Sequence, residues 1–398
     1  MFFNRRIPLF IRESYHYDSR ASVLWGIFYG LSLVFFPVIA RKIGANSFQI
    51  ALLTAAPFMG SLFTLYWSRL SNRSNKMQFF IWIKILARTV LFLMFFAVSP
   101  WVFIIIVFLN VFFEQAGSPA YTGIMKEIYP DSYRGRAMGY IRAEQAISAI
   151  FACYIGGVLL DRISYGYIFP LAAITGLLSL VFFAKIKVKN EPKVENVKKQ
   201  GLIPSEAIDI FKKDRRFFIY SLIFFTYGFG NLLAMPLYPI FLVDILHASN
   251  SLVGKLGSLS SLFCIISYIF GGRYIDKKGS LKSLTICFLL SSFIPLLYST
   301  SFNLSFIILA SIIFGLNVGS SELSRINYII KISKTKNVQT YWGIDFTLMG
   351  IRGLIAPFIG VGLMNFLGIR TAFFIAFAVV FTSFILIKLF RFSYGKPR

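Results

Sequence analysis

Several charged side chains lie inside long apolar runs of this sequence, where they could bind an ion or a charged solute. Arg88 and Glu114 lie in the middle of two consecutive runs, and Asn110 and Gln115 lie beside Glu114. A charged group in lipid costs several kcal/mol unless it is paired or hydrated. Because Arg88 and Glu114 have similar depths on consecutive antiparallel segments, we expect them to form an ion pair.

A second set of polar residues lies in the last third of the chain. Glu322 and Arg325 are three residues apart, which permits a local pair on a helix. Asp345 and Arg352 are seven residues apart, so they share one helix face about 10 Å apart along the axis. Asn317 adds an amide in the same predicted span as Glu322 and Arg325. These side chains are candidates for a substrate or proton pathway.

The chemistry of these groups suggests two roles. A medium of low dielectric favours a neutral carboxyl, so we predict that one of Glu114, Glu322 and Asp345 binds and releases a proton. A guanidinium binds carboxylates and phosphates in a planar fork. The candidate partners for a substrate anion are Arg88, Arg325 and Arg352.

Composition places these residues in a membrane protein. The chain has 398 residues, of which 57% are hydrophobic, 18% aromatic and 14% charged, and its mean hydropathy is +0.71. A soluble core cannot use so much apolar surface, whereas lipid solvates it, and about 20 apolar residues cross a bilayer as a helix. The predicted spans are 20–40, 48–67, 78–98, 101–123, 138–160, 164–185, 217–243, 250–271, 282–300, 303–329, 339–365 and 369–390.

The positive charge of the chain is placed asymmetrically. Of 41 lysines and arginines, 31 fall in alternate segments that include both termini, 4 fall in the opposite loops and the rest lie within spans. Cytoplasmic segments of membrane proteins carry such an excess. We therefore predict cytoplasmic termini in an inner membrane, and we exclude nucleic acid as the partner of the net charge of +25.

Other functional classes find no support in the sequence. The cysteines Cys153, Cys264 and Cys287 lie inside apolar runs, as small buried hydrophobes do, and His16 and His247 form no ligand cluster. We find no Ser/His/Asp arrangement and no phosphate-binding loop. We therefore expect neither an enzyme nor a metal or other cofactor, and we expect a monomer.

The spans fall into two similar sets of six. The long polar segment 186–216 divides the chain into predicted bundles 1–185 and 217–398. Residue pairs recur at an offset of 204 or close to it, which predicts a parallel repeat with a site between the halves near the midplane. The matched pairs are Asn46 and Asn250, Arg69 and Arg273, Gly139 and Gly343, and, at 207, Asn110 and Asn317.

A glycine-rich basic motif interrupts the apolar runs after residue 271. Its sequence, GRYIDKKG, has Gly272 and Gly279 at its ends and contains Arg273, Asp276 and Lys277. It resembles the G-x-x-x-D-R/K-x-G signature of the major facilitator superfamily. We expect Gly272 to allow close helix approach, Gly279 to allow a tight turn, and Asp276 to accept from a neighbouring helix or cation at a cytoplasmic gate.

Two further segments belong to the same predicted gate. The counterpart in the first half, SRLSNRSNK, has Arg69 and Arg73, but Asn72 replaces the aspartate. The run 130–139, with Arg134 and Gly135, is similar to the P-x-x-x-R-G-x-A-x-G run of the superfamily. Arg142 and Glu144 follow it, and we expect them to form an ion pair at this gate.

The resemblance covers the whole chain and implies transport by alternating access between two six-helix bundles. It also implies that Glu114 faces the central cavity, which is the alternative to a purely structural ion pair with Arg88. Helix breakers suggest hinges, with packing kinks as the alternative. These residues are Pro37, Gly228, Gly230, Pro236 and Pro239.

The function predicted for the chain is therefore secondary active transport of a small organic solute. Because acids lie at membrane depth, we expect coupling to protons. The aromatic content favours export of amphipathic compounds, whereas the intramembrane arginines favour a small organic anion. A sensor or scaffold of the same fold that transports nothing is the alternative from a different class.

Overall fold

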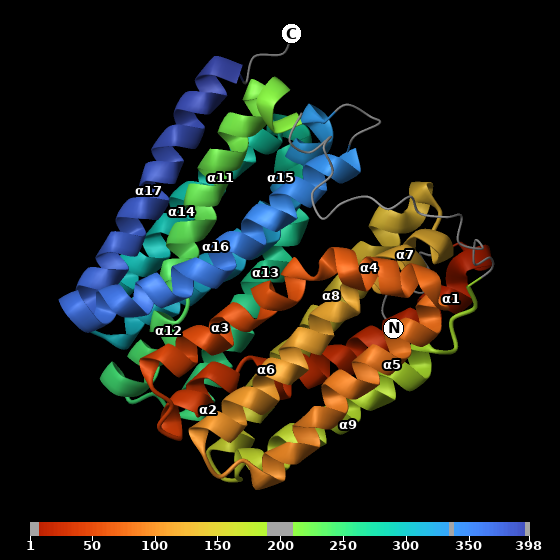
Figure 1. Cartoon of the computed structure of the whole chain (residues 1–398), viewed down its shortest axis with the longest axis horizontal. Helices are drawn as coiled ribbons and strands as arrows, with labels where there is room; N and C mark the ends of the chain where they lie inside the picture. The colour runs from red at the N-terminus through yellow and green to blue at the C-terminus, as the bar shows by residue number, and fades with distance from the viewer. Residues whose placement is uncertain (1–7, 189–209, 334–337, 395–398) are drawn as a thin grey trace. The chain divides into compact units, whose positions relative to one another are not determined.

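Every regular element among the described residues is a helix. The computed structural model describes residues 8–188, 210–333 and 338–394 (Figure 1). The first part contains α1 (Leu9–Phe28), η2 (Tyr29–Leu33), α2 (Phe36–Lys42), α3 (Ser47–Leu62), α4 (Thr64–Arg73), α5 (Lys76–Thr89), η3 (Val90–Phe96), α6 (Pro100–Ala116), α7 (Ser118–Ile128), α8 (Asp131–Leu160) and α9 (Tyr165–Phe183). The second part contains α11 (Arg215–Ala234), α12 (Leu237–Ile240), η4 (Phe241–Ile245), α13 (Asn250–Lys278), α14 (Ser280–Ser299), α15 (Leu304–Ile332), α16 (Val338–Leu367) and α17 (Ile369–Tyr394).

Length and composition of these helices match membrane spans. Within the described residues, 11 helices are long and apolar enough to cross a bilayer, and α3 is a shorter apolar helix. The helix observed at the predicted span 48–67 is therefore shorter than expected. It ends at Leu62, because Phe63 leaves the helical conformation before α4 begins.

The first and seventh predicted spans are each interrupted. The first begins earlier than predicted, at Leu9, and passes through the π-helix η2 before α2. Pro37 lies in the first turn of α2, where its missing N–H breaks no helical hydrogen bond. In the seventh, α11 ends before Pro236, and the short α12 with Pro239 leads into the π-helix η4. Proline therefore marks an interruption in both.

The chain divides into two compact units that do not follow the sequence halves strictly. One unit comprises residues 1–49, 59–198 and 247–261, and the other comprises 50–58, 199–246 and 262–398. The middle of α3 is thus grouped with the later helices, and the start of α13 with the earlier ones. Of the predicted linker 186–216, residues 189–209 lie outside the described ranges.

Small residues explain why the start of α13 belongs to the first unit. A Cβ on Gly157 of α8 would lie 2.5 Å from the Asn250 carbonyl oxygen, and one on Gly254 would lie 2.3 Å from that of Cys153. The two backbones can therefore touch. Asp161, just beyond α8, accepts the backbone N–H groups of Asn250 at 2.7 Å and Ser251 at 2.9 Å.

The charge of Asp161 suits this position at the start of α13. Partial burial alone would raise its pKa, but the hydrogen bonds from Ser251 and Asn250 and the charge of Lys42 outweigh that effect and lower the pKa. A carboxylate at a helix N-terminus also interacts favourably with the helix dipole. Asp161 therefore remains charged and caps α13.

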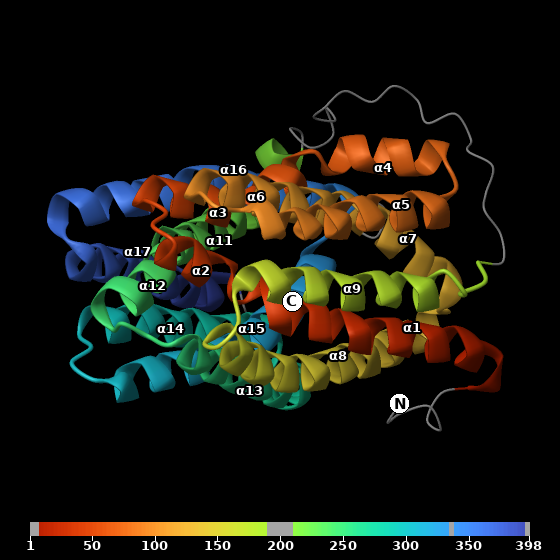
Figure 2. The same cartoon turned by 90° about the horizontal axis from the view of Figure 1, so that it is seen from below.

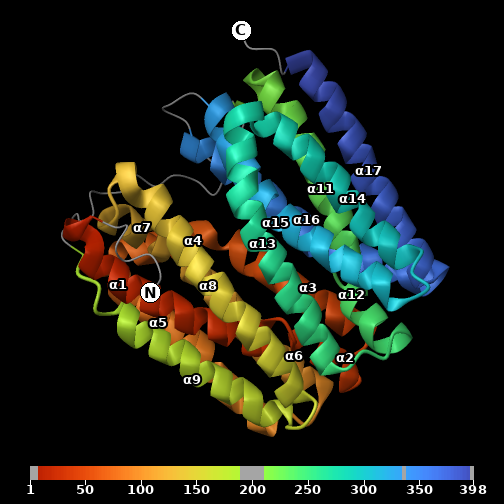
Figure 3. The ribbon, with the colours of Figure 1, turned by 180° about the vertical axis from the view of Figure 1, so that it is seen from behind.

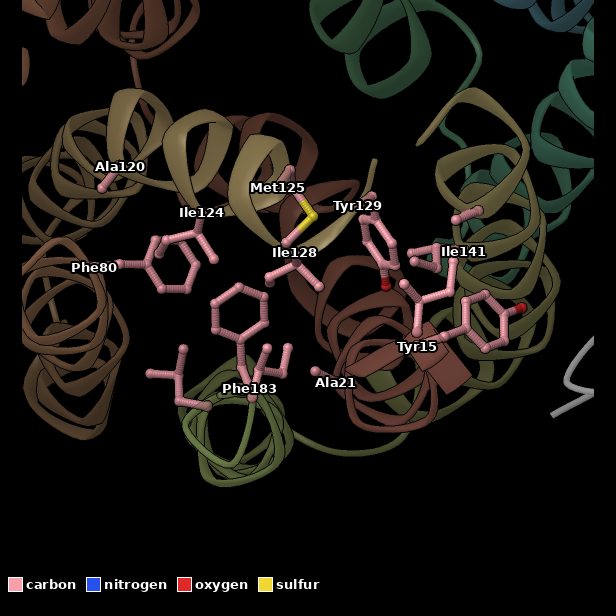
Figure 4. Close-up of a cluster of buried hydrophobic side chains, with 14 residues drawn as sticks. Tyr15, Ala21, Phe80, Ala120, Ile124, Met125, Ile128, Tyr129, Ile141 and Phe183 are labelled. Atoms are coloured by element: carbon pink, nitrogen blue, oxygen red, sulfur yellow. The ribbon is translucent and has the colours of Figure 1, made fainter. Parts of the chain in front are cut away.

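Each unit has a buried hydrophobic cluster of its own. In the first unit α1 lies beside α8 and α9 (Figures 2 and 3), and aromatic and aliphatic side chains of α1, α5, α7, α8 and α9 meet around Phe80, Ile124 and Phe183 (Figure 4). In the second unit α14 packs against α15 and α17 (Figure 3), and the cluster contains Phe217, Tyr220 and Phe288. These clusters fix the helices that carry the charged groups.

Candidate functional site

The first charged cluster joins α5 to α6. The carboxylate of Glu114 binds two cations, because Arg88 Nε donates to Oε1 at 3.1 Å and Lys84 Nζ forms an ion pair with Oε2. Lys84 Nζ also donates to the Glu114 carbonyl oxygen at 2.8 Å. The structure thus contains the expected Arg88–Glu114 pair and adds Lys84, which lies one helical turn before Arg88. The three charges leave one positive charge in excess.

Neighbouring helices complete the hydrogen bonding of Arg88. Its Nη1 donates to Ser179 Oγ of α9 at 2.8 Å and to the Gly176 carbonyl oxygen, and the guanidinium lies 5.4 Å from the centre of the Phe28 ring. Glycines leave the space that the cations fill. A Cβ on Gly176 would lie 3.0 Å from Arg88 Cδ, and one on Gly117 would lie 2.7 Å from Lys84 Cε.

Asn110 and Gln115 lie at the edge of this cluster. The buried Asn110 amide donates to the Ala87 carbonyl oxygen at 2.8 Å, and its own oxygen has no hydrogen-bond partner among the described residues. Gln115 packs against α3, where a Cβ on Gly60 would lie 2.8 Å from its Cβ. Both side chains therefore link α6 to a neighbouring helix.

The second charged cluster joins α15 to α16 in the other unit. Arg325 binds Asp345 through both Nε, at 2.7 Å, and Nη2. Three aromatic rings surround the Arg325 guanidinium, with centres 5.0 Å away for Phe224, 5.5 Å for Trp342 and 5.4 Å for Phe346. The carboxylate is buried, whereas 16% of the Arg325 side chain is exposed.

Arg352 lies deeper in the same cluster and is incompletely paired. It is 5% exposed, and its Nη1 donates to the Phe224 carbonyl oxygen of α11. Its Nε is buried without a hydrogen-bond partner among the described residues. A Cβ on Gly228 would lie 2.1 Å from Arg352 Cζ. Gly228, which we considered as a hinge, therefore provides the space for this guanidinium.

Tyr220 and Tyr227 of α11 lie near Arg352, and Asn317 of α15 joins this group through Tyr227. The Asn317 amide donates to the Tyr227 hydroxyl at 2.9 Å, and the Tyr227 ring stacks on Phe288 with centres 3.9 Å apart. The Asn317 side-chain oxygen and the Tyr220 hydroxyl have no partner in the part of the chain that the structure describes. Buried polar groups without partners are unusual in proteins.

Glu322 does not form the pair that its spacing with Arg325 suggested. Its carboxylate is exposed and accepts a hydrogen bond from the Tyr268 hydroxyl of α13 at 2.6 Å. Arg325 instead reaches across to Asp345 of α16. The local pair is therefore replaced by an interhelical pair, and only two of the three predicted carboxylates, Glu114 and Asp345, lie in cation clusters.

The GRYIDKKG segment is mostly helical. Residues 272–278 form the last turns of α13, and the turn is reduced to Gly279, whose φ of +84° suits glycine. Our expectation for Gly272 is wrong, since a Cβ there would meet nothing within 4 Å, whereas one on Gly271 would lie 2.4 Å from Ser320 Oγ of α15. Asp276 is exposed, so the described structure does not bury it against a neighbouring helix. Arg273 and Lys277 are exposed as well.

The other predicted gate residues are distributed over the first unit. Arg69 and Gly135 are exposed, and the side chains of Asn72 and Arg73 lie outside those that the structure describes. Arg134 binds the end of α7, because its Nε donates to the Tyr129 carbonyl oxygen at 3.2 Å.

Arg142 and Glu144 lie on different sides of α8. Residues two apart on a helix point in nearly opposite directions, and Arg142 is exposed while Glu144 is 1% exposed. Glu144 faces α1, where it accepts from the Tyr15 hydroxyl at 3.4 Å and from Ser19 Oγ. The expected Arg142–Glu144 pair is therefore replaced by a contact between α8 and α1.

The remaining helix breakers have packing roles in the structure. A Cβ on Gly230 would lie 2.6 Å from Val380 Cγ2 and 3.0 Å from the Val380 nitrogen, so this glycine allows α11 to approach α17. Pro37, Pro236 and Pro239 lie at the interruptions of the first and seventh spans described above.

Two buried charged residues were missed by sequence reasoning. Lys84 lies one helical turn before Arg88 but was not chosen as a site residue. Asp18 is 1% exposed and accepts from the Tyr129 hydroxyl at 3.0 Å. It was overlooked because the first span was placed from residue 20, whereas α1 begins at Leu9. A helical pattern that continues back to Leu9 is the signal that would have included it.

Comparisons with known proteins agree with this architecture. A mutant of the nucleoside transporter NupG superposes with a TM-score of 0.78 at 13% identity, covering 95% of this chain and 99% of that one. A bacterial homologue of the human lysosomal transporter Spinster, in an inward-facing and unoccupied conformation, gives a TM-score of 0.70 at 14% identity over 98% of both chains. At these identities the likeness shows the fold.

Sequence relatives match over part of their length. A 155-residue stretch is 24% identical to an uncharacterized transporter of Rickettsia felis, covering 37% of each chain. A 147-residue stretch is 26% identical to multidrug resistance protein 2 of Bacillus subtilis, covering 37% of this chain and 36% of the relative. The chain thus aligns with little more than a third of the length of these relatives.

The family itself is established by a match along the chain. The family model described as Major Facilitator Superfamily matches residues 19–234 and again 220–398. Two matches in tandem also agree with the repeat of the sequence. With its apolar helices, the chain is therefore a multi-pass membrane protein that belongs to the major facilitator superfamily.

Proposed function

We propose that this protein is a secondary transporter that moves a small organic anion by alternating access. The observation that carries the proposal is the buried Arg352, which makes no ion pair within the described residues and whose Nε lacks a partner. Arg325, the other cation of the cluster, already uses Asp345. An uncompensated guanidinium at membrane depth is expensive, and a carboxylate or phosphate would offset its charge.

The polar groups around Arg352 support a ligand at this place. The Asn317 oxygen and the Tyr220 hydroxyl add a possible acceptor and donor that the fold leaves unused. Phe224 contributes an apolar face, since both the Arg325 and the Arg352 guanidinium lie 5.0 Å from its ring centre. A substrate with an anionic group and an apolar or aromatic body would match this combination.

The first cluster is a weaker candidate for substrate binding than the second. Its Glu114 carboxylate already binds both Lys84 and Arg88, and Arg88 has further acceptors on α9. Such saturated hydrogen bonding favours the structural alternative for this ion pair. We therefore assign substrate charge recognition to Arg352 and Arg325, not to Arg88.

Export of amphipathic compounds is the second candidate. The aromatic rings around Arg325 and the likeness to a multidrug resistance protein favour it. A lipophilic cation, however, needs an available acid, and both Glu114 and Asp345 are bound to cations. The two candidates therefore differ in the sign of charge that the ligand must carry.

A ligand-stabilisation screen of the purified full-length protein distinguishes the candidates. A ligand that binds the folded state raises the melting temperature in proportion to its occupancy. The anionic probes are benzoate, salicylate and citrate, the lipophilic cation is tetraphenylphosphonium, and glucose is the neutral control. We expect stabilisation by one or more anions, and loss of that stabilisation in Arg352→Gln.

Arg370→Gln is the matched control. Arg370 also donates to a backbone carbonyl, that of Ser301 at 3.1 Å, and also lies beside an aromatic ring, but it is exposed at the start of α17. Anion stabilisation that survives in Arg352→Gln, or stabilisation by the lipophilic cation alone, would overturn the anion proposal. No stabilisation by any probe would favour the scaffold without transport.

The orientation and coupling belong to the same proposal. The excess of lysine and arginine in alternate segments supports cytoplasmic termini in an inner membrane, and the tandem family match supports bundles 1–185 and 217–398. Membrane-impermeant thiol labelling of Lys278→Cys and Arg162→Cys in intact cells tests the orientation, since only the second should react. We further propose that the coupling ion is a proton.

A further inference from the structure

A groove lies between α11 and α17 of the second unit, two helices that pack side by side (Figures 1 and 3). α11 lines it from Ile219 to Thr226 and α17 from Leu386 to Tyr394. On both helices the lining positions are spaced i, i+3, i+4 and i+7, which is one face of each helix. The volume is about 370 Å³, within the range of about 300–1,000 Å³ that is usual for ligand sites.

The groove is apolar and open to the outside of the unit. Ile223 and Phe390 are buried, whereas Leu222 is 49% exposed and Leu389 is 58% exposed. Both helices belong to segments that are long and apolar enough to cross a bilayer. Exposed leucines on such segments are solvated well by hydrocarbon and poorly by water. An acyl chain is therefore a suitable occupant of this groove.

Basic side chains lie at one end of the groove. Arg215 and Arg216 precede Ile219 by one helical turn, so they lie on the same side of α11 as the lining residues. Arg216 Nη2 donates to the carbonyl oxygen of Tyr394 at 2.9 Å, at the point where α17 completes the groove. Arg215 is exposed. The groove is thus apolar along its length and positive at this end.

The acid beside these arginines has other partners. Asp214 accepts from the backbone N–H of Phe217 at 3.0 Å and from the Tyr341 hydroxyl of α16 at 2.7 Å. It therefore caps α11 and links this helix to α16. Arg216, by contrast, donates to a neutral carbonyl. A phosphate group suits the two arginines, because a guanidinium binds its oxygens in a planar fork.

The positive end also lies on a suitable side of the membrane. α11 begins and α17 ends there, so in the orientation proposed above this end is cytoplasmic. The cytoplasmic leaflet carries anionic lipids, and basic pockets between spans bind their headgroups. A phospholipid has its phosphate and its acyl chains in the order in which the groove presents arginine and apolar surface. A small free anion would leave the apolar part unused.

We propose that this groove binds one anionic glycerophospholipid, with its phosphate at Arg215 and Arg216 and one acyl chain between α11 and α17. The site is distinct from the cluster around Arg352. Phe224, whose ring lies beside that guanidinium, follows Ile223 by one residue and so points about 100° away from it around α11. The lipid is therefore a ligand other than the transported solute, and its binding does not depend on the proposed anion transport.

Native mass spectrometry of the purified full-length protein tests the proposal. The probes are dioleoyl phosphatidylglycerol and dioleoyl phosphatidylcholine, which have the same acyl chains and differ in headgroup charge. We expect the protein to retain one phosphatidylglycerol at least fivefold more than phosphatidylcholine, and excess inorganic phosphate not to displace it. Equal retention of the two lipids would overturn the proposal. Displacement by phosphate would also overturn it, because the apolar groove would then contribute nothing.

Neutralising the arginines tests the headgroup contact. The double variant Arg215→Gln with Arg216→Gln should retain phosphatidylglycerol no better than phosphatidylcholine. Lys388→Gln is the matched control, because Lys388 is an exposed cation of α17 that lies two residues from Leu386 and Phe390 and so points away from the groove. It should leave retention unchanged. Full retention in the double variant, or an equal loss in Lys388→Gln, would contradict this site.

Filling the groove tests the acyl-chain contact without a change of charge. Thr226 Oγ1 donates within its own helix, to the Leu222 carbonyl oxygen at 3.0 Å, and Thr226→Trp should reduce retention of phosphatidylglycerol at least threefold. Thr122→Trp on α7 is the control, because Thr122 is exposed and donates in the same way to the Ser118 carbonyl oxygen at 3.1 Å. Undiminished retention in Thr226→Trp would overturn the proposed chain position.

Thermal stability provides a second readout of the same site. A ligand that binds the folded protein raises its melting temperature. Phosphatidylglycerol should therefore raise the melting temperature of wild type more than phosphatidylcholine does, and this difference should be lost in the double arginine variant. Equal shifts in wild type would contradict the proposal. The comparison of the two lipids on wild type is decisive even where a variant fails to fold.

Discussion

The two cation clusters contain the same charges but share them differently. Each has two basic side chains and one carboxylate, in the first cluster Lys84, Arg88 and Glu114. There the acid lies between both cations, and each cation has a further acceptor. In the second cluster Asp345 binds Arg325 alone, and Arg352 has only a backbone carbonyl as acceptor within the described chain.

This difference separates a structural ion network from a candidate binding site. Breaking a saturated buried network leaves an uncompensated charge, which destabilises the fold strongly. Substitution of an incompletely hydrogen-bonded cation destabilises the fold less, because the buried charge was already unfavourable. The substitution nevertheless removes the charge that would attract a ligand. Stability and ligand binding should therefore respond oppositely in the two clusters.

The largest expected effect is on stability when the acids are neutralised. Glu114→Gln leaves Lys84 and Arg88 without a counter-charge and should cost about 3–5 kcal/mol. Asp345→Asn removes the partner of a partly exposed arginine and should cost about 1.5–3 kcal/mol. Melting curves of both purified variants measure the difference. Equal losses would remove the distinction between the clusters.

Substitution of the arginines should reverse that order for ligand binding. Arg352→Gln is expected to weaken anion binding at least tenfold, about 1.4 kcal/mol, with little loss of melting temperature. Arg88→Gln should lower the melting temperature and leave the affinity of the remaining folded protein unchanged. Titration of the anion identified in the screen measures both. Reduced affinity in Arg88→Gln alone would transfer the site to the first cluster.

The glycine beside Arg352 offers a test that leaves every charge in place. Gly228→Ala would put a methyl group 2.1 Å from Arg352 Cζ and must displace the guanidinium. We expect anion affinity to fall several-fold. Gly362→Ala on α16 is the control, because a Cβ there meets nothing within 4 Å. Unchanged affinity in Gly228→Ala would show that the position of this guanidinium is unimportant for the ligand.

The smallest expected effect concerns the repeated asparagines. Asn110→Ala and Asn317→Ala each remove one buried hydrogen bond, to the Ala87 carbonyl and to the Tyr227 hydroxyl. Each should cost about 1 kcal/mol of stability. Only Asn317→Ala should also change anion binding, since Asn317 belongs to the cluster with Arg352. An equal effect of both variants on binding would argue against this asymmetry between the repeated positions.

Sequence reasoning succeeded where partners follow from depth alone. Arg88 and Glu114 have similar depths on consecutive spans, so an ion pair between them was predictable, and the structure contains it. It failed where the rotation of a helix decides the partner. Arg325 could pair within its own helix or reach another one, and it binds Asp345 instead of Glu322. Spacing along one helix does not distinguish these alternatives.

Errors in helix boundaries and in glycine roles have physical causes as well. Asp18 lay outside the predicted spans because the first helix was started too late, and its burial depends on the longer α1. Gly272 was chosen for its place in a motif, but the close contact is made by Gly271, one residue earlier. A shift of one residue turns a side chain by about 100° around a helix.

The sequence alone determined the membrane class, the twofold repeat of six spans and the likeness to the major facilitator superfamily. Hydropathy, the placement of lysine and arginine, and recurring motifs depend only on the order of residues along the chain. They can therefore be recognised without knowing which helices are in contact. The tertiary structure decided which cation each acid binds, that Gly228 makes room for Arg352, and that Glu144 of α8 accepts hydrogen bonds from α1. A helix that is apolar on all sides has little hydrophobic periodicity, so its sequence does not show which side faces a neighbouring helix. Only the packing of the helices decides which side chains meet.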